Sequence, residues 1–130
     1  SRGFKVVLSL ENKLLADEFS NDCIILEEPV SDIYSLLYYA LFTISSGDTV
    51  ARESAIMGVP TIYTGKRKMA VNKALVDEGL MLESSSVENI LRYVDTITSN
   101  TKRKTRRMSR DLIGNKWEDT TEVILRHILR

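Results

Sequence analysis

The stretch SSGDTVARESAIMGVP, residues 45–60, places small polar residues, a glycine and a carboxylate where a helix is expected to begin. Glycine lets another group approach the backbone closely, and the free N–H groups and dipole of a helix start attract anions. Glu53 lies further along the same helix, where its carboxylate is expected to reach a second, polyol part of one ligand. The spacing therefore favours a phosphate site with a sugar site beside it.

Two alternatives to a phosphate site remain open at this point. A turn from strand through glycine to helix occurs in every α/β protein, so this stretch is also explained as a plain connection between two parallel strands. Glu53 is equally explained as a solvated residue or as a partner of Arg52 or a lysine. Asp48 adds a negative charge beside the expected phosphate and argues against it, unless this carboxylate only caps the helix.

The stretch TGKRK, residues 64–68, repeats this arrangement after the next predicted strand. Gly65 follows the strand end, and Lys66, Arg67 and Lys68 are expected to open the following helix. The helix dipole disfavours cations at a helix start, so a functional role such as pairing with a diphosphate is a reasonable explanation. The alternative is a hydrated surface turn.

Strands and helices are expected to alternate around these two loops. Apolar runs predict strands at residues 4–10, 23–26, 41–44, 59–63 and 80–82. The continuous apolar run at 41–44 is typical of a strand covered on both faces. Capping and periodicity predict helices that start at Ser31, after the loop 45–47, at about Lys66 and at Ser85.

Particular residues are expected to end or begin these helices. Gly58 and Gly79 lie where left-handed C-caps are expected, and Ser85 with Glu88 forms a capping box. Short connections between alternating strands and helices imply right-handed crossovers. The predicted fold class is therefore α/β, a Rossmann-like three-layer parallel sheet with flanking helices and an all-helical C-terminal end.

The bulk properties fit a single soluble domain. The 130 residues are 43% hydrophobic, which is ordinary for a globular protein. The net charge is zero, so no overall electrostatic field would attract a nucleic acid or an acidic partner. Cys23 is the single cysteine, which excludes an internal disulfide and reads as a small buried residue. No apolar run is long enough to span a bilayer, and no signal peptide is visible, so we expect a cytoplasmic protein. The chain enters its first strand without a starter methionine, which suggests a fragment or an excised domain.

The C-terminal third contains a basic stretch at residues 101–110 and a histidine, His127. The stretch 101–110 carries six cations, namely Lys102, Arg103, Lys104, Arg106, Arg107 and Arg110. Binding to nucleic acid or to an anionic membrane is the functional interpretation, but no aromatic residues interleave and few are apolar, which favours a solvated connecting helix. A docking surface for a missing half or for a lipid-linked acceptor stays open. His127 is expected at the boundary of the last helix, without a catalytic role.

Taken together, these motifs resemble those of a known superfamily. The pattern Thr49-x-x-Arg52-Glu53-x-Ala55-x-x-Gly58-x-Pro60 is followed by Val71-x-Lys73-x-Leu75 and Glu78-Gly79-Leu80. This arrangement resembles the carboxyl-terminal domain of GT-B-type proteins, among them the peptidoglycan-type N-acetylglucosaminyltransferase and the UDP-N-acetylglucosamine 2-epimerases. It is closest to a prokaryotic, largely archaeal family known only as a domain of unknown function. The resemblance covers residues 4–98, and its specific part is confined to 45–80.

The resemblance implies a donor-nucleotide site. Glu53 takes the position of the glutamate that binds the ribose hydroxyls in GT-B transferases. The loop that faces the diphosphate corresponds to Ser45, Ser46, Gly47 and the amides of Asp48 and Thr49. The loop that lines the sugar or phosphate side corresponds to Thr64, Gly65 and Lys66, with Lys66 or Arg67 meeting the remaining charge. Such enzymes need neither a metal nor another cofactor, since the helix dipole and cations stabilise the departing diphosphate.

The resemblance also implies a domain organisation and leaves rival functions. Residues 1–100 would form the Rossmann-like nucleotide-sugar-binding core, and residues 101–130 would form helices that pack on it or on an N-terminal half absent from this sequence. That half supplies the acceptor site and the usual general base, so the chain is expected to bind a UDP-sugar but to be inactive alone. Asp48 stands where the family usually has a second glycine or a small residue. The doubly acidic helix start of the 2-epimerases is absent, since Arg52 precedes Glu53, and the step from glycine to glutamate is one residue longer, which favours a transferase over a sugar-nucleotide 2-epimerase, the first alternative. A non-catalytic module that binds nucleic acid or another anionic partner through residues 102–110 is the second, and nucleic acid is the less expected partner.

Overall fold

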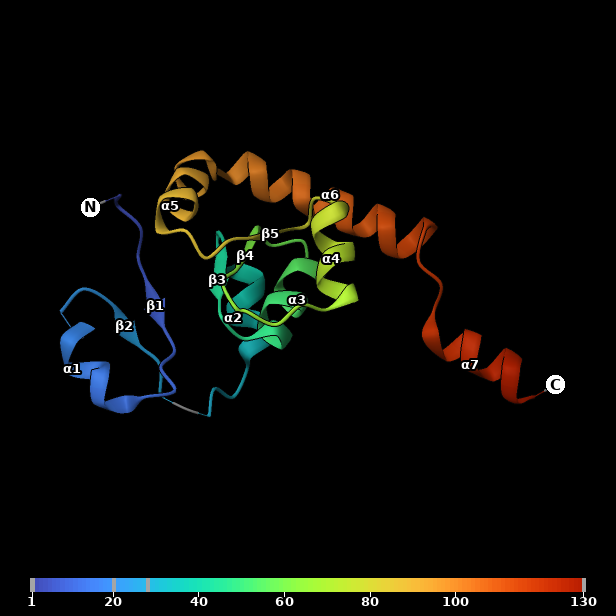
Figure 1. The fold of residues 1–130 in the computed structure, drawn as a ribbon, viewed down its shortest axis with the longest axis horizontal. Helices are drawn as coiled ribbons and strands as arrows, with labels where there is room; N and C mark the ends of the chain where they lie inside the picture. Colours follow the sequence, from blue (N-terminus) through green and yellow to red (C-terminus); the bar gives the residue numbers. More distant parts are fainter. Residues whose placement is uncertain (1, 20, 28, 130) are drawn as a thin grey trace. The chain divides into compact units, whose positions relative to one another are not determined.

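Alternating strands and helices form parallel sheets flanked by helices, so the predicted Rossmann-like α/β fold is confirmed (Figure 1). The computed structural model describes residues 2–19, 21–27 and 29–129. Contacts divide the chain into two compact units, Ser1–Ile33 and Tyr34–Arg130. Each unit is described by itself below.

The first unit contains two short parallel strands. Strand β1 (Val7–Leu8) pairs with β2 (Ile24–Ile25), and the 3₁₀ helix η1 (Lys13–Leu15) and helix α1 (Ala16–Phe19) connect them. The Asn12 side chain accepts a hydrogen bond from the Leu14 amide at 3.1 Å and so caps η1. Both strands are shorter than predicted. Cys23 is only partly buried, so the prediction of a buried cysteine is wrong.

The second unit contains a three-stranded sheet in the order β3-β4-β5, with all strands parallel. Its elements in chain order are β3 (Thr43–Ser45), α3 (Asp48–Ile56), β4 (Thr61–Tyr63), α4 (Ala70–Asp77) and β5 (Met81–Glu83), preceded by α2 (Ile33–Tyr39). Helices α3 and α4 are the crossover connections that parallel strands require. Strand β4 is central and all three of its residues are buried.

The chain ends in three helices, as predicted. These are α5 (Val87–Thr96), the long α6 (Ser99–Asn115) and α7 (Thr120–Ile128). A capping box starts α6, in which the side chains of Thr98 and Thr101 each accept from the other residue's backbone N–H. None of the helices in the described ranges combines the length and the apolarity needed to cross a membrane.

The core lies between the sheet and helices α3 and α4. Tyr63, Leu75 and Leu80 are almost completely buried in it, and each buried side chain of this size stabilises the fold by about 1.5–3 kcal/mol. Ala51 and Ala55 place small side chains at 0% exposure on one face of α3. These small residues let the α3 backbone lie close to the sheet, which fixes where α3 begins.

Helix α6 is attached to the C-terminal ends of α2 and α3 through polar side chains. The Thr105 hydroxyl donates to the Gly58 carbonyl at 2.8 Å, and the Ser109 hydroxyl donates to the Ile56 carbonyl. Lys102 donates to the Ala40 carbonyl and Arg106 to the Tyr38 carbonyl at 2.7 Å. These bonds satisfy carbonyls that a helix C-terminus leaves unpaired.

The two cations of this contact are therefore structural. The Arg106 guanidinium also lies 4.0 Å from the centre of the Tyr38 ring, a cation–π contact. Burial, and then the charge of Arg106, lower the pKa of the Lys102 ammonium. The expectation that 101–110 is simply a solvated helix is wrong for this face, because α6 also buries Thr105, Ser109 and Leu112.

Three local expectations are also wrong. Helix α4 begins at Ala70, so Lys66, Arg67 and Lys68 lie in the preceding loop and do not oppose a helix dipole. Strand β3 is not covered on both faces, since Ile44 is 47% exposed. The N-cap of α5 is Ser86, whose hydroxyl accepts from the Asn89 amide, so the capping box of Ser85 and Glu88 does not form.

The glycines after α3 and α4 provide a test of the α6 attachment. Gly58 and Gly79 both have φ of +74°, as the predicted C-caps require. A Cβ at Gly58 would lie 2.5 Å from the backbone Cα of Arg106, whereas at Gly79 the nearest atom is the flexible Met108 Cε at 3.3 Å. We expect Gly79→Ala to lower the free energy of unfolding by about 1 kcal/mol and Gly58→Ala by about 2–4 kcal/mol, measured by urea denaturation. Equal losses would show that α6 does not approach α3 this closely.

Candidate functional site

The carboxyl ends of the three parallel strands meet at one edge of the sheet. Beyond the ends of β3 and β4 the chain stays paired, since the Thr64 amide donates to the Ser45 carbonyl at 2.9 Å and the Ser84 amide to the Tyr63 carbonyl at 3.0 Å. The loop 45–47 and the loop 64–69 therefore leave the sheet side by side. Such an edge is where ligands bind in open parallel sheets.

Helix α3 begins at this edge without a side-chain cap. Its N-cap is Gly47, and no side chain among the described residues caps this helix start by a hydrogen bond. The Ser45 hydroxyl instead accepts from the Gly47 amide at 3.1 Å and donates to the Gly47 carbonyl at 3.0 Å. Gly47 is exposed, has an ordinary φ of −81°, and a Cβ there would meet only Ser45 Oγ at 3.6 Å. The protein's own packing therefore does not require glycine at this position.

The charge of Asp48 is balanced by two arginines. Its Oδ2 lies 3.8 Å from Nη2 of Arg52 and 3.5 Å from Nη1 of Arg67. Arg52 also donates to Thr49 Oγ1 at 3.4 Å, so it pairs with Asp48 and not with Glu53. The negative charge that argued against a phosphate site is thus compensated within the site.

The Glu53 carboxylate contacts a residue that the sequence did not single out. The Tyr34 hydroxyl of α2 donates to Glu53 Oε1 at 3.2 Å, and both side chains reach solvent. Thr49 lies one turn before Glu53 on α3, on the same side of the helix. The contact between residues 34 and 53 joins two helices, so no local spacing in the sequence could have identified it.

The loop 64–69 is held against the start of α3. A Cβ on Gly65 would lie 2.5 Å from the Ser46 carbonyl oxygen, so only glycine fits, and the buried Tyr63 hydroxyl donates to the Arg67 carbonyl at 3.4 Å. Arg67 then contacts Asp48, while Lys68 pairs with Glu83 at the end of β5. Two consecutive cations of the loop therefore contact acids that follow β3 and end β5, the strands on the two sides of β4, and Lys66 is exposed beside them.

Helix α4 also begins without a side-chain cap, at Met69. Helices α5, α6 and α7 differ, because Ser86, Thr98 and Asp119 cap them. The two uncapped helix starts both follow strands of the sheet at its carboxyl edge. The cationic loop 64–69 lies between them in the chain.

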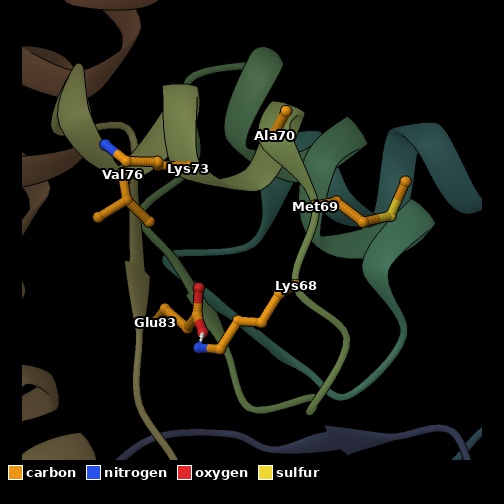
Figure 2. A pocket seen from close by; sticks show the side chains of 6 residues that line it. All are labelled: Lys68, Met69, Ala70, Lys73, Val76 and Glu83. Carbon is orange, nitrogen blue, oxygen red and sulfur yellow. Dashed lines mark hydrogen bonds and ion pairs between the residues drawn. The ribbon is translucent and has the colours of Figure 1, made fainter.

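A hollow of about 440 Å³ lies beside the start of α4. Figure 2 shows the Lys68 and Glu83 side chains meeting on one side of it and residues of α4 on the other. Its lining residues are Lys68, Met69, Ala70, Lys73, Val76 and Glu83. None of the predicted site residues lines this hollow. About half of them are exposed and the others are partly buried.

The structure brings most of the predicted residues together and leaves one apart. Direct contacts join Ser45 to Thr64, Ser46 to Gly65 and Asp48 to Arg67. Glu53 is hydrogen-bonded to Tyr34 and, in the described part of the chain, to none of these side chains. His127 is bonded to its own helix, with Nδ1 at 2.8 Å from the Val123 carbonyl. Within the described ranges, no three His, Cys, Asp or Glu residues are grouped as a metal site would require.

Comparisons with known proteins agree with the resemblance to a family known only as a domain of unknown function. The chain is 37% identical over 65 residues to "Uncharacterized protein MJ0665" of Methanocaldococcus jannaschii, an alignment that covers 49% of this chain and 19% of the relative. The chain thus matches about a fifth of that protein's length. No solved structure matches the chain. The model of the family described as "Protein of unknown function (DUF354)" matches residues 9–129, and the chain therefore belongs to this family.

Proposed function

We propose that this chain binds a nucleoside diphosphate sugar and forms the donor-binding half of a metal-independent, GT-B-like glycosyltransferase. The observation that carries the proposal is the pair of uncapped helix starts, α3 and α4, at the carboxyl edge of a parallel sheet with a cationic loop between them. Each start presents first-turn amides and the positive end of a helix dipole. Together they suit a ligand with two adjacent phosphates.

The diphosphate binds at the start of α3. Gly47 leaves room for a phosphate oxygen next to the amides of Asp48 and Thr49, which explains a glycine that the fold itself does not need. Arg67 is 73% exposed on its side chain and is held only by Asp48, so it is free to pair with a phosphate. Lys66 adds a second cation. These groups stabilise the charge that develops on a departing diphosphate.

The sugars occupy positions on either side of the diphosphate. Glu53 accepts hydrogen bonds from the ribose hydroxyls, and each carboxylate oxygen has lone pairs to spare beside the bond from Tyr34. The hollow between Lys68, Glu83 and α4 receives the transferred sugar, because it combines charged groups with the apolar surface of Met69 and Val76. Uridine is the expected nucleoside from the resemblance to GT-B proteins.

The chemical step needs residues outside this chain. GT-B-type proteins take the acceptor site and the general base from their other half, and the relative in Methanocaldococcus jannaschii is several times longer than the matched region. The chain alone is therefore expected to bind the donor without turnover. A sugar-nucleotide 2-epimerase would use the same bound donor, so a binding experiment tests the step that both reactions share.

The first prediction concerns UDP binding and Glu53. Titration of the 130-residue chain with UDP is expected to shift the backbone amide NMR signals of residues 45–49 and 64–67. Glu53→Gln removes the charged acceptor of the ribose hydroxyls and should weaken UDP binding by roughly tenfold or more. Glu88→Gln, at an exposed carboxylate on α5 that is paired with Arg92, is the control and should change nothing. Shifts confined to other parts of the chain would contradict the proposal.

The second prediction concerns the bond from Tyr34. Tyr34→Phe keeps the ring but frees the Glu53 side chain, so UDP affinity should fall by roughly threefold to tenfold as orientation is lost. The affinity for 2′,3′-dideoxy-UDP should stay the same, because that ligand has no ribose hydroxyls to donate. Tyr39→Phe on the same helix is the control, since the ring of Tyr39 packs edge-on against Tyr38. An equal loss with both ligands would assign Tyr34 a purely structural role.

A further inference from the structure

Helix α6 has a second polar face, opposite to the one that holds α2 and α3. Arg103, Arg107 and Arg110 lie four and three residues apart, so they share one side of the helix, and all three are exposed. Lys104 is exposed beside them. The buried residues Thr105, Ser109 and Leu112 lie on the opposite side. We refer to Arg103, Arg107 and Arg110 as the arginine row.

The arginine row has no acidic partner among the described residues, whereas most cations of residues 34–129 outside α6 have one. Outside α6, each described cation of that range except Lys66 lies within 4.0 Å of a carboxylate, namely Arg52, Arg67, Lys68, Lys73, Arg92, Lys116 and Arg126. In the row, Arg103 donates only to the Asn100 side chain, and no described carboxylate pairs with Arg107 or Arg110. Asp111 is the single acid on α6 and forms no ion pair with them.

This concentration of exposed charge is open to a partner outside the described residues. Like charges three and four residues apart on a helix repel each other, so the row does not stabilise α6. Arginine binds phosphate groups with two parallel hydrogen bonds, which a carbonyl or a water molecule does not offer. The row therefore suits a surface of phosphate groups. Because it stands on the outer, convex side of one helix, a flat surface fits it better than a narrow groove does.

Helix α7, which follows α6 after residues 116–119, supplies an independent observation. Large apolar side chains of α7 and its C-cap remain exposed, namely Ile124, Leu125, Ile128 and Leu129. Polar groups of this helix have partners nearby in the chain, since Asp119 caps its start and Glu118 pairs with Arg126. A short helix with an uncovered apolar side next to a row of cations is typical of segments that lie in the interface of a bilayer.

We propose that α6 and α7 form a docking surface for a bilayer that contains anionic phospholipids. The arginine row contacts the headgroup phosphates, and the apolar side of α7 enters the boundary between headgroups and acyl chains. A nucleic acid would offer phosphates to the row but nothing to the isoleucines and leucines of α7, and no aromatic residue interleaves with the row to stack on bases. The bilayer is therefore the partner that uses both features.

The experiment is co-sedimentation of the chain with phosphatidylcholine vesicles, with or without phosphatidylglycerol. The wild-type chain should bind only the anionic vesicles. The variant Arg103→Gln/Arg107→Gln/Arg110→Gln should bind roughly a hundredfold more weakly, about fivefold for each charge removed. The matched control Lys68→Gln/Lys73→Gln/Arg92→Gln removes the same net charge at paired sites outside α6 and α7, and it should bind within a few-fold of wild type.

A second variant tests α7. Ile124→Ser/Ile128→Ser keeps the charges and should leave only binding that is lost at high salt, since the apolar contribution is gone. Circular dichroism checks that each variant is folded, which is expected because all the changed side chains are exposed. Equal binding by the two triple variants would overturn the proposal, as would equal binding to neutral vesicles. Tighter binding of the chain to duplex DNA than to anionic vesicles at the same salt would overturn it in favour of nucleic acid.

Discussion

The direction of the parallel strands is the constraint on which the rest of this structure depends. In such a sheet, the connecting helices begin at the carboxyl edge and end at the amino edge, so unpaired N–H groups collect at one edge and unpaired carbonyls at the other. The hydrogen bonding of these groups differs between the two edges. At the amino edge, α6 covers the carbonyls of α2 and α3 with four side chains. At the carboxyl edge, the starts of α3 and α4 have no side-chain cap.

Electrostatics follows the same division. At the carboxyl edge, the carboxylate of Asp48 is matched by the guanidinium groups of Arg52 and Arg67, so its negative charge is compensated. On α6, two cations are committed to helix carbonyls and the arginine row has no described acidic partner. The net charge of zero conceals this contrast, because it averages over a balanced site and an unbalanced helix face.

What the sequence predicts well is set by local rules. Gly58 and Gly79 mark the ends of α3 and α4 correctly, since a left-handed cap depends on neighbouring residues alone. Helix α4 begins four residues later than the sequence predicts, and the loop 64–69 before it is held by the close approach of Gly65 to Ser46 and by the bond from Tyr63 to the Arg67 carbonyl. The exposure of Ile44 likewise depends on what covers β3, which an apolar run alone does not indicate.

The candidate site also has features that the sequence predicts and features that it does not. The juxtaposition of the loops 45–47 and 64–69 follows from parallel strands and was predictable, whereas the contact between Tyr34 and Glu53 depends on how α2 lies against α3. The sequence alone does not predict the structural role of Lys102 and Arg106, because the carbonyls that they bind are 62 and 68 residues away in the chain. A run of cations in a sequence does not reveal which of them face carbonyls and which face solvent.

The attachment of α6 has a consequence for how this chain can vary. Thr105, Ser109, Lys102 and Arg106 all donate to main-chain carbonyls, which every amino acid carries. Substitutions along α2 and at the end of α3 therefore leave these acceptors in place, provided that the helices keep their path. Gly58 and Tyr38 are exceptions, because the missing side chain of Gly58 makes the approach possible and the ring of Tyr38 contacts the Arg106 guanidinium. The junction therefore depends on the side chains of α6, on Gly58 and on Tyr38, and much less on the other side chains of α2 and α3.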